Sequence, residues 1–204
     1  MMSDPEIIER IGGRSDLADL QAYRAPQIEA QIRLNTNESP YPPPESFLED
    51  LANRLGTLSL NRYPDREAFE FRQALAAHAG TITERVWAAN GSNEILLQTL
   101  LAFGGTERKA MTFEPTYAMH SHIIRISETR LLRARRNPDF TMDLDASVSA
   151  VRAQEPDIVF MCSPNNPTGN PNSEEEIDAI CETSSSRGGL VILDEAYAEF
   201  AGWN

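Results

Sequence analysis

Hydrophobic residues between positions 86 and 194 follow two alternating patterns. Short apolar runs rich in Val, Ile, Leu and Phe predict β-strands, and the segments between them, with apolar residues three or four positions apart, predict helices. The predicted strands are 86–89, 109–113, 129–134, 157–162 and 190–194, and the predicted helices are 92–103, 117–126, 144–153 and 174–183. Strands joined by helical crossovers form a mostly parallel sheet with helices on both faces. We therefore predict an α/β fold with ligand sites at the carboxyl ends of its strands.

The chain before residue 86 has a different pattern. Two amphipathic helices are predicted, at 44–56 and 66–80, and each ends at a glycine. Their apolar faces contain Phe47, Leu48, Leu51 and Leu55 in the first helix and Ala68, Phe69, Leu75 and Ala79 in the second. The stretch "SPYPPP" cannot continue a helix, so residues 1–45 are predicted to form an extended arm, with a disordered tail as the alternative. Residues 46–204 are expected to belong to one large domain.

Composition and charge limit the classes of partner. The 204 residues are 41% hydrophobic and 24% charged, which is ordinary for a globular protein. The formal net charge is −13 at pH 7. Nucleic acids and anionic membrane surfaces would be repelled by this charge, so neither is expected to be the main partner. Small molecules are the expected ligands.

The cysteines and histidines form no metal-binding pattern. Cys162 and Cys181 lack the spacing of metal ligands and are too few for a disulfide scaffold, which predicts a reducing cytoplasm. His78, His120 and His122 have no ligand spacing with cysteines or carboxylates and are expected to be surface or core residues. The amino terminus is charged, and the longest nearly uncharged stretch, "ILLQTLLAFGG", is too short to span a bilayer. We expect a soluble, unprocessed protein without a metal site.

Polar residues follow the ends of three predicted strands. In "AANGSNEILLQ", a break at Gly91 precedes a helix that begins near Ser92 and Asn93, where free N–H groups and the helix dipole favour a phosphate group. The alternative is that Ser92 or Asn93 only caps the helix. In "CSPNNPTG", Asn166 lies between two prolines, and such rigid neighbours let its amide bind a ligand at low entropic cost. The alternative there is a structural turn.

The third strand end is "LVILDEAYAEF". Asp194 follows four apolar residues, and a buried carboxylate needs a cationic or hydrogen-bonding partner. Tyr197 can bring its hydroxyl to the same cavity, whereas the alternative makes Asp194 a helix cap and Tyr197 a core aromatic. A phosphate site, an amide, and a carboxylate near a phenol are together what pyridoxal 5′-phosphate requires, because the carboxylate keeps the pyridine nitrogen protonated.

An ordered set of motifs carries a family resemblance. It consists of "LNTNESPYPPP", "NRYPD", "GSNE", "EPTYAMH", "CSPNNPTG" and "LDEAY". In this order and spacing the chain resembles histidinol-phosphate aminotransferase, a class II member of the fold-type I pyridoxal-phosphate aminotransferases, from about residue 15 to its last residue. The resemblance implies amino transfer between L-glutamate and imidazole-acetol phosphate, in histidine biosynthesis, by a homodimer.

The resemblance also implies roles for particular residues. The cofactor residues would be Ser92 and Asn93 at the phosphate, Tyr117 stacked on the pyridine ring, Asn166 and Tyr197 at the ring hydroxyl, and Asp194 at the ring nitrogen. Tyr63 would reach into the site of the neighbouring subunit. Asn37 and Glu38, in the arm, would help to close over substrate.

One departure from the family is large. Its members continue beyond residue 204 into a segment with the Schiff-base lysine, so this chain resembles the amino-terminal part, with an incomplete large domain, and is expected to be inactive alone. The only lysine, Lys109, begins a predicted strand and should lie at the wrong edge of the sheet. A threonine-phosphate decarboxylase or another class II aminotransferase would share every motif quoted. A non-catalytic binding or dimerisation fragment is the alternative from another class.

Overall fold

The computed structural model of the chain describes residues 13–21, 28–33 and 37–201. These residues belong to two compact units. The first contains the described residues of 1–20 and 89–204, and the second those of 21–88. Parts of the predicted extended arm, residues 1–12, 22–27 and 34–36, lie outside the described residues.

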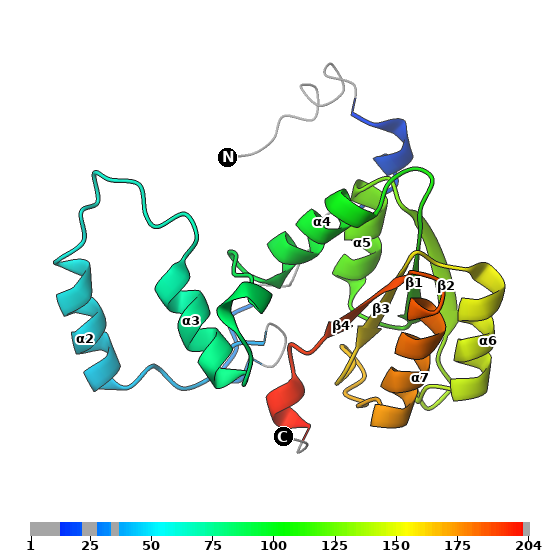
Figure 1. Cartoon of the computed structure of the whole chain (residues 1–204). Helices are drawn as coiled ribbons and strands as arrows, with labels where there is room; N and C mark the ends of the chain where they lie inside the picture. Colours follow the sequence, from blue (N-terminus) through cyan, green and yellow to red (C-terminus); the bar gives the residue numbers. More distant parts are fainter. Residues whose placement is uncertain (1–12, 22–27, 34–36, 202–204) are drawn as a thin grey trace. The chain divides into compact units, whose positions relative to one another are not determined.

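The helices and strands follow in an alternating order after residue 91 (Figure 1). The elements are η1 (Ser15–Leu17), α2 (Glu45–Leu55), α3 (Phe69–His78), η2 (Thr83–Arg85), α4 (Ser92–Phe103), β1 (Lys109–Glu114), α5 (Ala118–Ile126), β2 (Arg130–Arg135), α6 (Leu144–Gln154), β3 (Ile158–Cys162), α7 (Glu174–Ser185), β4 (Leu190–Asp194) and η3 (Ala198–Phe200). Among these described helices, none has the length and apolar character that crossing a membrane needs.

The first unit contains a parallel sheet with the strand order β2-β1-β3-β4. Every pair of neighbouring strands is parallel, and the register runs from Lys109↔Arg130 between β1 and β2 to Cys162↔Asp194 between β3 and β4. From β1 the chain crosses over to β2, at one side of the sheet, whereas from β3 it crosses over to β4, at the other side. The direction of winding therefore reverses between β1 and β3. Ligands of such sheets bind outside the carboxyl ends of the strands near this reversal.

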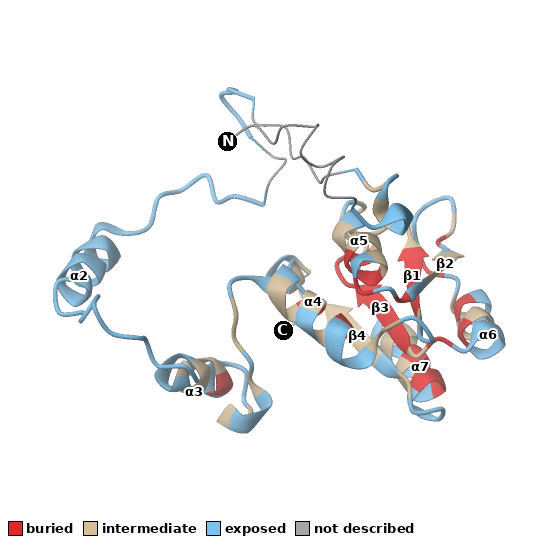
Figure 2. Cartoon of the chain, turned by 90° about the horizontal axis from the view of Figure 1, so that it is seen from above, coloured by how far each residue is buried: buried red, intermediate tan, exposed pale blue. Residues whose placement is uncertain are grey.

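Helices cover both faces of the sheet, which confirms the predicted fold. Alternate residues of a strand point to opposite faces. In β3, Ile158 and Phe160 pack in one core cluster with residues of α4 and α5, whereas Val159 and Met161 pack in the other with residues of α6 and α7. Because both of its faces are covered, all five residues of β3 are buried (Figure 2).

Local sequence determines where α6 and α7 begin. The Asp143 carboxylate accepts a hydrogen bond from the Ala146 N–H, at the start of α6. At the start of α7, the Ser173 hydroxyl accepts from the Glu176 N–H while the Glu176 carboxylate accepts from the Ser173 N–H. These bonds satisfy N–H groups that have no partner inside the helix.

The predicted strand at 86–89 is wrong. Residues 86–89 have no strand geometry and follow the short helix η2. The main-chain oxygen of Val86, which a ladder would use, accepts a hydrogen bond from Arg72 Nε at 2.7 Å. Apolar alternation over four residues is therefore insufficient here, where none of the described strands pairs with residues 86–89.

The second unit exposes the apolar faces of its helices. None of the described residues of α2 is buried, and Ala76 is the one buried residue of α3 (Figure 2). The predicted face of α2 is 42–54% exposed at Phe47, Leu48, Leu51 and Leu55. Ala68, placed on the second predicted helix, lies at its N-cap with a left-handed backbone. Helical periodicity therefore predicted both helices without establishing what their faces contact.

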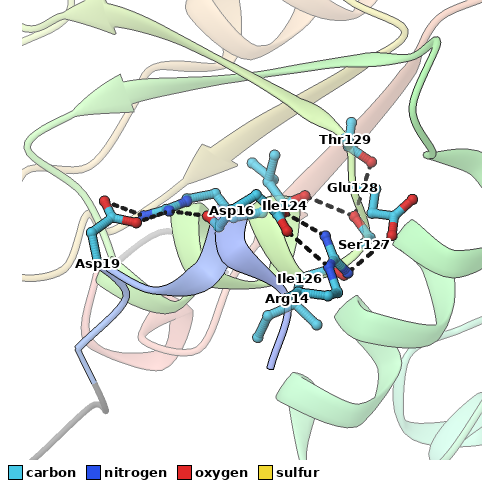
Figure 3. A network of polar contacts seen from close by, with 9 residues as sticks. Arg14, Asp16, Asp19, Ile124, Ile126, Ser127, Glu128 and Thr129 are labelled. Carbon is cyan, nitrogen blue, oxygen red and sulfur yellow. Dashed lines mark hydrogen bonds and ion pairs between the residues drawn. The ribbon is translucent and has the colours of Figure 1, made fainter. Parts of the chain in front are cut away.

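The short helix η1 is bound to the carboxyl-terminal end of α5 (Figure 3). Arg14 donates to the main-chain oxygen of Ile126 at 2.9 Å and forms ion pairs with Asp16 and Glu128. Arg125, at the end of α5, forms an ion pair with Asp19. The contacts join two segments that are more than a hundred residues apart in the sequence.

Candidate active site

Polar groups gather at the carboxyl edge of the sheet, where the chain reverses its winding between β1 and β3. Asn165, in the loop that follows β3, donates from Nδ2 to the main-chain oxygen of Pro115, directly after β1, at 3.0 Å. The same amide donates to Thr168 Oγ1 at 2.8 Å. Asn165 is 1% exposed, so the loop after β3 is fixed to the end of β1. The sequence analysis did not identify this residue.

Asp194 ends β4, and its carboxylate is nearly buried, with a side-chain exposure of 9%. Oδ2 lies 2.9 Å from His120 Nε2, and Oδ1 accepts from the Ala196 N–H at 3.1 Å. Burial raises the pKa of Asp194, but the hydrogen bonds from His120 and Ala196 outweigh it, so the pKa lies below its ordinary value. The carboxylate is therefore ionised at neutral pH.

His120, which was expected to be a surface or core residue, is fully buried on α5. Its ring packs against Phe160 with centroids 4.8 Å apart and meets the Tyr117 ring edge-on at 5.4 Å. A signal was available in the sequence, because His120 shares the apolar face of the predicted helix with Ile123 and Ile124. A polar side chain on an apolar helix face needs a hydrogen-bonding partner.

Asn166 and Tyr197, which the resemblance assigns to the same cofactor group, lie together. Asn166 Nδ2 donates to the Tyr197 hydroxyl at 3.5 Å, a long hydrogen bond, and both residues are half-buried. The Asn166 N–H donates to the sulfur of Cys162 at 3.4 Å. Burial raises the pKa of Cys162 to about 11, so this thiol is uncharged at neutral pH.

The amino-terminal end of α4 has no side-chain cap. Gly91 occupies the N-cap position with φ +87°, a backbone conformation that favours glycine. Ser92 and Asn93 are exposed residues of the first turn, so neither occupies the capping position that the alternative gave them. Main-chain N–H groups in the first turn of a helix have no intrahelical partner and can bind an anion.

The remaining predicted site residues differ in their surroundings. Tyr117 is half-buried at the N-cap of α5, and its ring lies nearly perpendicular to the His120 ring. Asn37, Glu38 and Tyr63 are exposed residues of the second unit. Their roles stay predictions. Lys109 begins β1 at the amino edge of the sheet, as predicted, and its ammonium donates to the main-chain oxygen of Gln154.

Comparisons with known proteins identify relatives of the whole chain. The family described as "Aminotransferase class I and II" matches residues 29–203. Histidinol-phosphate aminotransferase of Corynebacterium glutamicum (strain R) is 45% identical over 92% of this chain and 53% of its own length. A histidinol-phosphate aminotransferase sequence from Mycolicibacterium smegmatis is 42% identical over 98% of this chain and 94% of its own length. The chain thus spans about half the length of the first of these relatives.

Solved structures agree with the sequence relatives. Histidinol-phosphate aminotransferase from Sinorhizobium meliloti, in complex with pyridoxal-5′-phosphate, has a TM-score of 0.74 and 26% sequence identity. The comparison covers 98% of this chain and 50% of that one. The parallel sheet, the order of its crossovers and the sequence relatives lead to one conclusion. This chain belongs to the class I and II aminotransferase family.

Proposed function

We propose that this chain is the cofactor-binding part of a pyridoxal-phosphate-dependent aminotransferase. The observation that carries the proposal is the nearly buried, ionised carboxylate of Asp194, at the sheet edge where ligands of this fold bind. Perturbed titratable groups in such places are candidates for function. The relatives named histidinol-phosphate aminotransferase, and the S. meliloti structure with pyridoxal-5′-phosphate, support the same activity.

The donor set at this edge fits the cofactor. An ionised carboxylate suits a pyridinium nitrogen, the Asn166 amide and the Tyr197 hydroxyl suit a ring oxygen, and the uncapped first turn of α4 at Ser92 and Asn93 suits a phosphate. Tyr117 offers an aromatic face for the ring. When bound, the cofactor supplies a ring that accepts the electron pair released from an amino-acid substrate.

Each residue has a role that its own chemistry supports. Asp194 holds a proton at the ring nitrogen, and Asn166 with Tyr197 orients the ring through its hydroxyl. The substrates we propose are L-glutamate and imidazole-acetol phosphate, and we propose Asn37 and Glu38 as residues that close over them. We also propose a cytoplasmic homodimer in which the fully exposed Tyr63 reaches the site of the partner subunit.

Covalent attachment needs a lysine at the same edge. The chain has one lysine, Lys109, and it lies at the opposite edge of the sheet. The amino ends and the carboxyl ends of parallel strands are separated by the length of a strand, so the Lys109 ammonium does not reach the proposed cofactor site. We therefore propose that the isolated chain binds the cofactor without a covalent bond and does not transfer amino groups.

Binding and labelling of the 204-residue chain test this proposal. Pyridoxamine 5′-phosphate, which has no aldehyde, should bind saturably with one molecule per chain, as measured by titration calorimetry. Incubation with pyridoxal phosphate, borohydride reduction and peptide mass spectrometry should give no stoichiometric label on Lys109, and glutamate should not be converted. Absence of pyridoxamine phosphate binding contradicts the cofactor assignment, and stoichiometric Lys109 labelling with turnover contradicts the proposed role of the chain.

A further inference from the structure

We propose that Asn165 is a positioning residue of the cofactor site, which joins the loop after β3 to residues 115–117, between β1 and α5, and so fixes Asn166 relative to Tyr117. The inference rests on the proposed function, which it deepens by adding a residue to the site. The roles implied by the family resemblance include Asn166 and Tyr117 but not Asn165.

The side-chain amide of Asn165 has one possible orientation. Its Nδ2 carries two hydrogens and meets two acceptors, the main-chain oxygen of Pro115 at 3.0 Å and Thr168 Oγ1 at 2.8 Å. A main-chain oxygen only accepts, so the amide atom that faces Pro115 is the nitrogen. Asn165 Oδ1 is buried without a hydrogen-bonding partner among the described residues. Both amide hydrogens are therefore used, and a rotation of the side chain would break both bonds together.

The main chain of Asn165 closes the same loop. Its N–H donates to the main-chain oxygen of Asn170 at 2.8 Å, and its own main-chain oxygen accepts from the Gly169 N–H at 2.7 Å. Gly169 has φ +76°, a conformation that favours glycine and lets the chain turn back. The main chain of Asn165 thus holds the turn together, while its side chain attaches the turn to the end of β1. A displacement of Asn165 would carry Asn166 with it.

A second contact joins the same two segments, but it is weaker. The Cys162 sulfur accepts from the Asn166 N–H at 3.4 Å and forms a hydrogen bond with the Thr116 side chain. Sulfur is a weak hydrogen-bonding atom. Asn165 is 1% exposed, and a hydrogen bond that is shielded from water in this way is stronger than an exposed one. The bond from Asn165 is therefore the main connection between the segments.

This connection prepares the site for binding. Asn165 directly precedes Asn166, the proposed donor to the ring oxygen, and Pro115 lies two residues before Tyr117, which offers an aromatic face to the ring. Groups that already hold their binding positions lose little freedom when a ligand arrives. Without the bond, the two segments would have to be ordered during binding, and the affinity for the cofactor would fall.

Two variants and a control separate this bond from the others in the loop. Asn165→Leu keeps a side chain of similar size but cannot donate. Thr168→Val removes the other acceptor of the same amide and leaves the bond to Pro115. Asn170→Leu is the matched control, because Asn170 is a half-buried residue of the same loop whose Nδ2 lies 3.5 Å from the main-chain oxygen of Asp139. Amide spectra of each 204-residue chain check that the fold is retained.

The first measurement needs no cofactor. Main-chain order parameters are obtained from ¹⁵N relaxation of the apo chain. They should fall at both Asn166 and Tyr117 in Asn165→Leu, at Asn166 but not at Tyr117 in Thr168→Val, and at neither in Asn170→Leu. Unchanged values at Asn166 and Tyr117 in Asn165→Leu would overturn the proposal. An equal fall at Tyr117 in Thr168→Val would also overturn it, because the effect would then not depend on the bond to Pro115.

The wild-type chain decides if Asn165→Leu fails to fold. The side-chain amide hydrogens of Asn165 should exchange with solvent more slowly than those of Asn170, because they are buried and both are hydrogen-bonded. Exchange as fast as that of Asn170 would show that the amide does not hold the two segments, and the proposal would be wrong.

The second measurement compares two probes by titration of the 204-residue chains. In Asn165→Leu the affinity for pyridoxamine 5′-phosphate should fall about tenfold, a loss on the scale of one hydrogen bond. Inorganic phosphate, which is expected to bind only at the first turn of α4, should bind within about twofold of wild type. Asn170→Leu should bind both probes as the wild type does.

The outcomes distinguish a positioning role from a general loss of structure. Equal losses for the two probes in Asn165→Leu would overturn the proposal, and so would an unchanged affinity for pyridoxamine 5′-phosphate. A wild-type chain that does not bind one of these probes would contradict the proposed function alone, because the order parameters of the apo chain still decide whether Asn165 holds the two segments.

Discussion

The two edges of the sheet each hold a carboxylate, but they hold it in different ways. At the amino edge, Asp157 accepts from Arg108 Nη1 at 2.7 Å and from the Lys109 N–H at 2.8 Å. At the carboxyl edge, Asp194 accepts from an imidazole and from the main chain. A guanidinium always brings a full positive charge. Asp157 is thus already paired with a cation, whereas Asp194 is held by donors and is available to a cationic ring.

Exposure separates the two carboxylates further. Arg108 is 57% exposed and the Asp157 side chain 25%, whereas His120 is fully buried and the Asp194 side chain 9% exposed. Burial raises the pKa of Asp157, and the hydrogen bonds from Lys109 and Arg108 outweigh it, so its pKa is also lowered. A lowered pKa alone therefore does not distinguish a binding group from a structural ion pair. The surroundings of the carboxylate do.

The largest expected effect comes from removing the packing beneath the carboxyl edge. Phe160→Ala should lower the free energy of unfolding by about 3–5 kcal/mol, because Phe160 is buried and supports the His120 ring. Ile158→Ala, in the same strand and core cluster but nearer the amino edge, should cost about 2–5 kcal/mol. Denaturant titration measures both, and the pH titration of the Asp194 carboxyl, followed by NMR, should change in Phe160→Ala only. If the titration of Asp194 changed equally in Phe160→Ala and Ile158→Ala, the distinction between the two edges would be removed.

The next effect compares one substitution at both edges. Asp194→Asn removes the charge that we assign to the ring nitrogen, and the affinity for pyridoxamine 5′-phosphate should fall about a hundredfold, as for a hydrogen bond between charged groups. Asp157→Asn makes the same chemical change at the amino edge and should leave the affinity within about twofold of wild type. Titration calorimetry of the 204-residue chains measures both. Similar losses in the two variants would disprove the assignment of Asp194.

The smallest effect concerns the stability that the amino-edge pair contributes. Asp157→Asn should destabilise the chain by at most about 1 kcal/mol at neutral pH and low salt, and by less at high salt, because Arg108 is largely exposed. The folded pKa of Asp157 is lowered, so its contribution is present above its unfolded pKa and is lost as the pH falls through the folded value. Denaturant titrations at pH 7 and below the ordinary value of 3.8 should therefore show the difference from wild type disappearing in acid. A difference that is independent of both salt and pH would contradict this account.

The sequence by itself determined the elements of the sheet and the edge that carries the site. The predicted strand 109–113 became Lys109–Glu114, and the predicted helix 92–103 became Ser92–Phe103, because periodicity, glycines and capping residues act over a few neighbouring positions. Parallel strands joined by helices place their carboxyl ends at one edge, so the loops that carry Asn166 and Tyr197 were predicted to lie at the same edge. The family resemblance, and not the order of the elements, assigned the two side chains to one cofactor group, and in the structure they lie together.

Tertiary structure decided which side chains meet. His120 and Asp194 are 74 residues apart, and their contact depends on how α5 lies over β3 and on the register between β3 and β4. No local pattern contains that information. Residues 86–89 show the converse, because they had the local pattern of a strand while Arg72 took the Val86 oxygen. Hydrogen bonds to a neighbouring strand and burial against a distant helix are properties of the folded chain, so they could not be predicted from periodicity within one segment.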